Sequence, residues 1–335
     1  MKLRPVILII LLFLIPSIEA QEDLYQSAKE YRKPYLVVTE VINYLRENHD
    51  LSWLFFEGDV SIEHSVQKQE LNLRLARSKL KEFDHLLNIY SELKVVSKAG
   101  VEHKSIMLNF FDEIRPEVSE MLWLGELVLQ ATKSNDFDAL QGLSGLQIRQ
   151  RIFLLASESA VSRASIPQIE VWHPARYRVL CNIAGNDTLT DVLRFTDSWI
   201  NEDREEDLIL FVRSAEQNLR SYNQHIRDGF NKTNEFVPML RTDQQIAGNP
   251  ELLSVFEEMA IVFVDVFRNE LGIANSLTET VAMFREIAVG NAPPSENVKK
   301  FESTMSSLDL LLAKRVDHVR LVNALLDRSL YITSQ

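Results

Sequence analysis

Residues 249–271 read NPELLSVFEEMAIVFVDVFRNEL, and this stretch decides the fold class. Its apolar residues recur every three or four positions, which places them on one face of an α-helix rather than on alternate sides of a strand. The apolar row consists of Leu252, Phe256, Met259, Phe263, Val266 and Phe267. Asn249 before Pro250 is a typical helix start, because the asparagine side chain caps the helix and the proline fits its first turn. The stretch therefore predicts a long amphipathic helix with a buried face.

The same spacing recurs along most of the chain. In residues 66–90, one face carries the row Leu73, Ala76, Leu80, Phe83, Leu87 and Tyr90. We expect helices at residues 22–48, 62–98, 102–131, 137–164, 175–184, 188–228, 250–271, 277–289 and 295–331. Two of these starts rest on capping-box spacing, at Thr188 and Ser276. Because no segment alternates convincingly with period two, the sequence predicts an all-α protein of long antiparallel helices.

The sharpest interruption of helical periodicity lies between Ser165 and Pro174. Two prolines follow there in quick succession, in Ile166-Pro167 and His173-Pro174. Proline disfavours helix at the residue before it. We therefore divide the mature chain into an N-terminal bundle, residues 21–173, and a C-terminal bundle, residues 174–335. One elongated body with helices running through both parts is the alternative.

The first 20 residues have the pattern of a signal peptide. Lys2 and Arg4 precede an unbroken apolar run at residues 6–15. Pro16 and Ser17 end this run, and Ala20 is the small residue expected at a cleavage site. This run is well short of the roughly 20 residues that a membrane span needs. We expect cleavage after Ala20 and a periplasmic or secreted mature protein. No later apolar run approaches spanning length, so no transmembrane span is expected after cleavage.

Net charge bounds the class of partner. The full chain carries a formal charge of -12, and loss of Lys2, Arg4 and Glu19 with the leader takes it to -13. A strongly acidic protein is repelled by phosphate backbones, so nucleic acid is not an expected partner. A partner protein or a small anionic ligand is expected instead, with homo-oligomerisation left open.

Motifs of common enzyme classes are missing from the sequence. There is no Gly-x-Ser-x-Gly elbow, no phosphate loop and no His-Glu-x-x-His zinc helix. Cys181 is the single cysteine and forms no disulfide within the chain. We expect it to be a small buried residue rather than a nucleophile.

Two Glu-x-x-His pairs raise one enzymatic alternative. Glu82 with His85 and Glu170 with His173 each place two metal ligands on one helix face. Carboxylate bundles that hold two iron or manganese ions use this pair twice. The alternative function is therefore a dinuclear Fe or Mn oxidase, whereas the leading interpretation needs no cofactor.

The predicted joint concentrates aromatic and cationic side chains. Trp172, Arg176 and Tyr177 lie within six residues of one another there. This composition suits an anion or a partner carboxylate. The alternative is that the aromatic rings fill the seam between the two halves.

A family resemblance points to a second group of residues. Residues 144–152, SGLQIRQRI, and residues 284–294, FREIAVGNAPP, resemble the periplasmic helical sensor domains of nitrate-responsive and type IV pilus chemoreceptors. Those domains carry a Gly-x-x-Arg-Gln-Arg type signature, from which this chain departs by an insertion between Gly145 and Arg149. The resemblance implies Arg149, Gln150 and Arg151 as ligand-binding positions, and paired guanidinium groups suit a small oxyanion.

These observations favour an exported, non-enzymatic helical-bundle protein. Its expected role is to bind a partner protein or a small ligand as an accessory sensor or scaffold.

Overall fold

The structure is a computed structural model, and it describes residues 62–95, 98–165, 173–200, 205–291 and 295–333. Within these ranges the chain is helical and contains no strand. The helices are α2 (Ile62–Glu92), α3 (Lys98–Ser134), α4 (Phe137–Ser165), α5 (His173–Ile200), α6 (Glu205–Thr242), α7 (Gln244–Ala247), α8 (Pro250–Ala288) and α9 (Ser295–Thr333). The predicted all-α class is confirmed. The predicted leader and the predicted helix at 22–48 lie outside the described residues.

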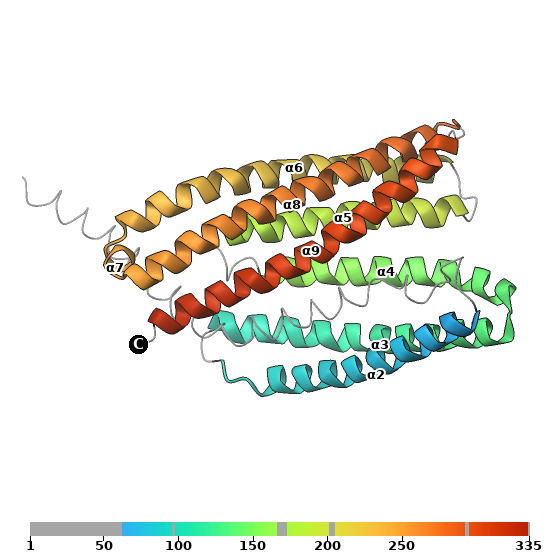
Figure 1. Ribbon diagram of the computed structural model, residues 1–335, viewed down its shortest axis with the longest axis horizontal. Coiled ribbons are helices and arrows are strands. Elements are labelled where there is room, and N and C mark those ends of the chain that lie inside the picture. Colours follow the sequence, from blue (N-terminus) through green and yellow to red (C-terminus); the bar gives the residue numbers. More distant parts are fainter. Residues whose placement is uncertain (1–61, 96–97, 166–172, 201–204, 292–294, 334–335) are drawn as a thin grey trace, which may run out of the picture.

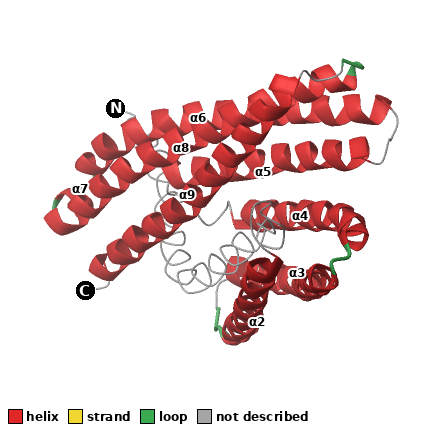
Figure 2. Ribbon diagram, turned by 45° about the vertical axis from the view of Figure 1, so that its right-hand side comes forward, coloured by secondary structure: helices red, strands yellow, loops and turns green. Residues whose placement is uncertain are grey.

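Long antiparallel helices lie side by side in two groups. Helices α5, α6, α8 and α9 form one bundle, and α4 lies between this bundle and α3 (Figure 1). Figure 2 shows the same order in a turned view, with α2 at the outer edge beside α3. Helix α5 packs against α4, α6 and α8. Among the described helices, the extensive contacts of α2 are with α3 alone, and those of α9 are with α8 alone.

The main hydrophobic core fills the bundle of α5, α6, α8 and α9. All six residues of the predicted α8 row are buried there, Phe267 completely. Phe195 and Phe284 stack with ring centroids 4.1 Å apart. Gly229 lets α6 approach α8, because a Cβ at this position would lie 2.2 Å from the Phe267 ring. Residues of α5, α6 and α8 are therefore closely packed in the middle of the bundle.

The two predicted helix starts based on capping boxes are wrong. Thr188 lies inside α5, and Ser276 lies inside α8. Thr188 is completely buried, and its hydroxyl donates to the carbonyl oxygen of Ala184 at 2.7 Å. A threonine inside a helix can donate its hydroxyl to the carbonyl oxygen four residues earlier. Thr188 therefore does not have to cap a helix N-terminus. The helices predicted at 175–184 and 188–228 are therefore replaced by α5 and α6, and those at 250–271 and 277–289 by the single helix α8.

The predicted ends of α8 are confirmed. The Asn249 side chain accepts from the backbone N–H of Leu252 at 3.1 Å, directly before Pro250. At the other end Gly290 has a φ of 81°, and its N–H donates to the carbonyl oxygen of Ile287 at 3.0 Å. A left-handed glycine here closes the helix without steric cost.

The predicted boundary at residues 173 and 174 coincides with the start of α5 at His173. Helix α4 packs on α5 across this boundary, and Leu155 of α4 belongs to the main core. The division into two bundles remains a prediction. Among the described residues, no helix combines the length and the apolar content required to cross a membrane.

Candidate functional site

One edge of the α2–α3 hairpin is joined by a ladder of ion pairs. On α2 the paired residues are seven apart, which keeps them on the same side of the helix. The pairs are Glu70 with Lys133, Arg77 with Glu126, and Asp84 with Arg115. At the end of α2, the Lys104 ammonium donates to the carbonyl oxygens of Ser91 and Leu93, both at 2.6 Å. These exposed polar contacts therefore link α2 and α3 along one edge of the hairpin.

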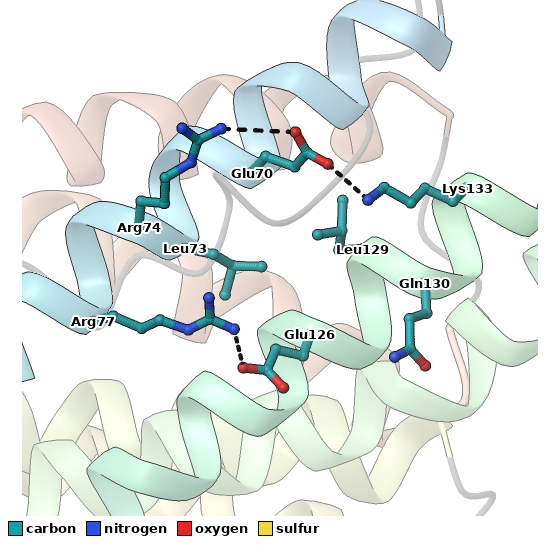
Figure 3. A pocket seen from close by; sticks show the side chains of 8 residues that line it. All are labelled: Glu70, Leu73, Arg74, Arg77, Glu126, Leu129, Gln130 and Lys133. Carbon is teal, nitrogen blue, oxygen red and sulfur yellow. Dashed lines mark hydrogen bonds and ion pairs between the residues drawn. The ribbon is translucent and has the colours of Figure 1, made fainter.

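A groove of ≈ 410 Å³ opens between α2 and α3 beside this ladder. Its volume lies within the range of small-molecule sites in proteins. It is lined by Glu70, Leu73, Arg74, Arg77, Glu126, Leu129, Gln130 and Lys133 (Figure 3). Charged side chains lie at both ends, with the two leucines and Gln130 between them. The groove thus combines three cations, two carboxylates, one amide and an apolar floor.

The two ends of the groove differ in charge. At one end Glu70 contacts two cations, the Lys133 ammonium at 2.7 Å and the Arg74 guanidinium at 3.8 Å. The hydrogen bond and the charge of Lys133 lower the pKa of Glu70, so its carboxyl group is ionised at neutral pH. At the other end Arg77 and Glu126 form a balanced pair. The Arg74 side chain is 72% exposed, which leaves its guanidinium open to a solute.

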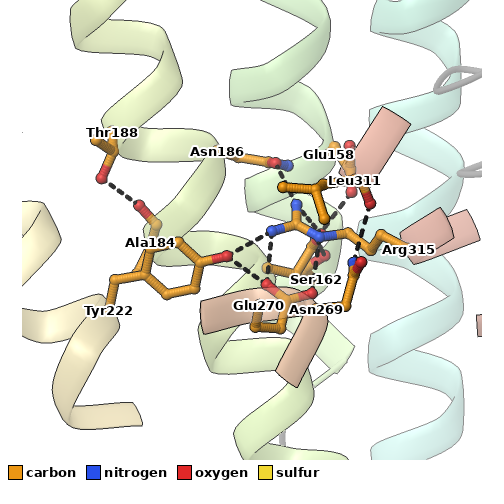
Figure 4. A network of polar contacts seen from close by, with 11 residues as sticks. Glu158, Ser162, Ala184, Asn186, Thr188, Tyr222, Asn269, Glu270, Leu311 and Arg315 are labelled. Atoms are coloured by element: carbon orange, nitrogen blue, oxygen red, sulfur yellow. Dashed lines mark hydrogen bonds and ion pairs between the residues drawn. The ribbon is translucent and has the colours of Figure 1, made fainter. Parts of the chain in front are cut away.

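A second polar assembly lies inside the bundle, centred on Arg315 of α9 (Figure 4). Arg315 binds Glu270 of α8 with two parallel hydrogen bonds, Nε to Oε1 at 2.8 Å and Nη2 to Oε2 at 2.7 Å. Its Nη2 also donates to the Tyr222 hydroxyl of α6 at 2.8 Å, and this hydroxyl donates to Glu270. Its Nη1 donates to Asn182 at 3.2 Å and Asn186 at 3.3 Å, both on α5. The cluster therefore connects α5, α6, α8 and α9.

Helix α4 joins the same cluster through Glu158. The Asn182 amide donates to Glu158 at 2.8 Å, and Glu158 is only 1% exposed. Burial by itself lowers the pKa of Arg315, but the charge of Glu270, its hydrogen bond to Arg315 and the charge of Glu158 outweigh it and raise that pKa above its ordinary value. Burial and the Glu270 carboxylate raise the pKa of Tyr222, so the phenol stays protonated. The Arg315 and Glu270 side chains are 6% and 2% exposed, which closes the cluster to solutes.

Cys181 lies completely buried beside this cluster, as the sequence predicted. Burial and the nearby Glu270 carboxylate raise the pKa of the Cys181 thiol well above its ordinary value. Because the thiolate is the reactive form, the folded protein holds Cys181 as an inert thiol.

The positions implied by the sensor-domain resemblance lie on α4. The Arg149 side chain is exposed and contacts Asp197 of α5 at 3.5 Å, and Arg151 is half-buried. The side chain of Gln150 lies outside the described residues. The Arg149 guanidinium is therefore partly neutralised by a neighbouring carboxylate.

The candidates at the predicted joint lie at the opposite end of α5. Arg176 and Tyr177 are half-buried in its first turns, and the Tyr177 ring packs against the main core. Arg149 contacts α5 at Asp197. Arg176 lies about 30 Å from Asp197 along the axis of α5. The two candidate groups are thus separate, and Trp172 lies outside the described residues.

The structure describes part of the proposed metal set. His85 is exposed on α2, whereas Glu170 and the side chains of Glu82 and His173 lie outside the described residues. Among the residues that are described, no group of three or more His, Cys, Asp or Glu side chains is placed to hold a metal ion. The iron or manganese site remains an untested hypothesis.

Neither the groove nor the buried cluster was predicted from the sequence, although both leave a trace in it. Leu308, Arg315 and Val322 repeat every seven residues, so the arginine falls on an apolar row. Glu270 likewise continues the α8 row after Phe267. A charge that interrupts a core stripe on two helices indicates a buried pair. The groove needs the pairing of α2 with α3, which periodicity alone does not supply.

Comparison of the chain with models of protein families, with curated proteins and with solved structures gives no match.

Proposed function

We propose that this protein is an exported, non-enzymatic binding protein whose ligand site is the groove between α2 and α3. The bundle of α5, α6, α8 and α9 serves as its rigid support. The protein acts in the periplasm or outside the cell as an accessory sensor or scaffold, without a resident cofactor.

The observation that carries the proposal is the composition of the groove. Exposed guanidinium, ammonium and carboxylate groups surround two leucines in a space of ≈ 410 Å³. Small-molecule sites typically combine an apolar surface with a few convergent polar groups. In contrast, the ion pair at the centre of the Arg315 cluster is closed to solvent, which suits a structural role.

The position of the groove also supports the proposal. Among the helices that the structure describes, α2 packs extensively on α3 alone, and the joining ion pairs are exposed. Exposed ion pairs contribute little to stability, so a ligand can replace one partner at low cost. A ligand in the groove would contact both helices and change how firmly α2 is held. Such a coupling would allow binding to be sensed by a partner protein on the outer side of α2.

A thermal-shift screen of the full chain against amino acids, short peptides, sugars and carboxylic acids tests the proposal. We expect at least one class to raise the unfolding temperature, because a ligand that binds only the folded state stabilises it. The double variant Arg74→Gln/Arg77→Gln should lose this shift. Turnover of any of these compounds by the purified chain would contradict the non-enzymatic assignment, and the absence of every shift would contradict the binding assignment.

A further inference from the structure

The groove between α2 and α3 presents opposite charges at a fixed spacing. Glu70 and Arg77 are seven residues apart on α2, which corresponds to about 10 Å along a helix. Glu126 and Lys133 have the same separation on α3, in the antiparallel direction. The two closed ion pairs therefore mark the ends of a channel about 10 Å long, with the Arg74 guanidinium at the Glu70 end and Gln130 between the ends.

This arrangement disfavours ligands of a single charge. A simple anion would meet Glu70 and Glu126, and a simple cation would meet three basic side chains. A molecule with one charge of each sign, at opposite ends, can contact a partner at both. We propose that the groove binds short zwitterionic peptides of about three residues, through their free termini. An extended chain of three residues spans about 10 Å, which matches the channel.

The charge asymmetry fixes the direction of the peptide. The end with Glu70 has two cations, Lys133 and Arg74, and therefore receives the terminal carboxylate. A guanidinium group binds a carboxylate through two parallel hydrogen bonds, and Arg74 is exposed enough to do so. At the other end, the Glu126 carboxylate receives the terminal ammonium in place of Arg77.

The middle of the groove suits the body of a peptide. The Gln130 amide carries both a donor and an acceptor, the pair that a peptide group needs. Leu129 is half-buried and provides the apolar surface for one side chain, above Leu73, which is only 3% exposed. A small apolar residue at the central position of the peptide is therefore favoured over a charged one.

This inference rests on the proposed function and is tested by calorimetric titration of the full chain with the tripeptide Ala-Leu-Ala. We expect saturable binding that weakens at least tenfold when the peptide is N-acetylated and at least tenfold when it is C-amidated. Arg74→Gln should abolish the penalty for amidation, and Glu126→Gln the penalty for acetylation. A tenfold change corresponds to 1.4 kcal/mol at 25 °C, a typical value for one charged contact.

Matched control variants are available on α8. The Arg268 side chain is 70% exposed, against 72% for Arg74, and Glu257 is 39% exposed, against 42% for Glu126. Arg268→Gln and Glu257→Gln should leave peptide binding unchanged.

The outcomes separate the two proposals. The proposal that the groove binds the free termini of the peptide is overturned by equal affinity for free and blocked peptides. It is also overturned if Arg74→Gln leaves binding unchanged. Failure of the wild-type chain to bind Ala-Leu-Ala overturns the peptide assignment even if another class of compound shifts its unfolding temperature. In that case the binding function stands with a different ligand.

Discussion

Replacing Arg315 with methionine removes the centre of the buried cluster and keeps a side chain of similar length. Glu270, whose side chain is 2% exposed, then loses both hydrogen bonds of its cationic partner. The Tyr222 hydroxyl remains as its donor. Removing one member of a buried ion pair costs about 3–5 kcal/mol, because the other charge is left without compensation. We expect Arg315→Met to lower the free energy of unfolding by that amount.

Urea unfolding followed by far-UV circular dichroism measures this loss, and a double variant tests its cause. Glu270→Leu combined with Arg315→Met removes both charges, so at least about 2 kcal/mol of the loss should be recovered. Arg268→Met is the control, because its pair with Asp265 lies at the surface, and its effect should stay within about 0.5 kcal/mol. A loss below 1 kcal/mol for Arg315→Met, or strictly additive single and double variants, would refute the reasoning.

Three further predictions concern the same bundle. Gly229→Ala places a methyl group 2.2 Å from the Phe267 ring and should destabilise the protein by about 1–3 kcal/mol in urea unfolding; a neutral effect would show that α6 and α8 are not in close contact there. Burial lowers the pKa of His225 and of His318, so the unfolded chain binds protons more readily, and stability should fall as the pH drops below about 6.5. Replacing both histidines by glutamine should reduce the change of the unfolding temperature with pH. An unchanged pH dependence would show that other groups cause it. Cys181 should resist a thiol reagent in the native protein and react once urea unfolds it, and fast native labelling would contradict its burial.

The fold could be predicted from the sequence to the level of long antiparallel helices because apolar spacing records burial directly. The α8 row and the cap at Asn249 are confirmed for that reason. The breaks predicted at Thr188 and Ser276 are wrong, because a polar residue within a helix can bond to its own backbone. Local pattern does not distinguish that case from a helix start.

The candidate site was harder to predict because it depends on which helices pair. Arg74 and Glu126 are ordinary surface residues in the sequence, and they gain a shared role only when α2 lies antiparallel to α3. The same holds for Arg315, whose partners lie up to 133 residues away. The ligand-binding residues predicted from the sequence, such as Arg149 and Arg176, were selected for their local composition. In the structure Arg149 lies on α4, beside Asp197 of α5, whereas Arg176 lies near the start of α5.

Hydrogen exchange of the full chain, measured with and without saturating Ala-Leu-Ala, tests the central claim most directly. Ligand contact with both walls of the groove should slow amide exchange in residues 70–77 of α2 and 126–133 of α3, and leave α8 and α9 unchanged. Protection that appears in α8 or α9 while α2 and α3 exchange as before would contradict the assignment of the groove as the binding site.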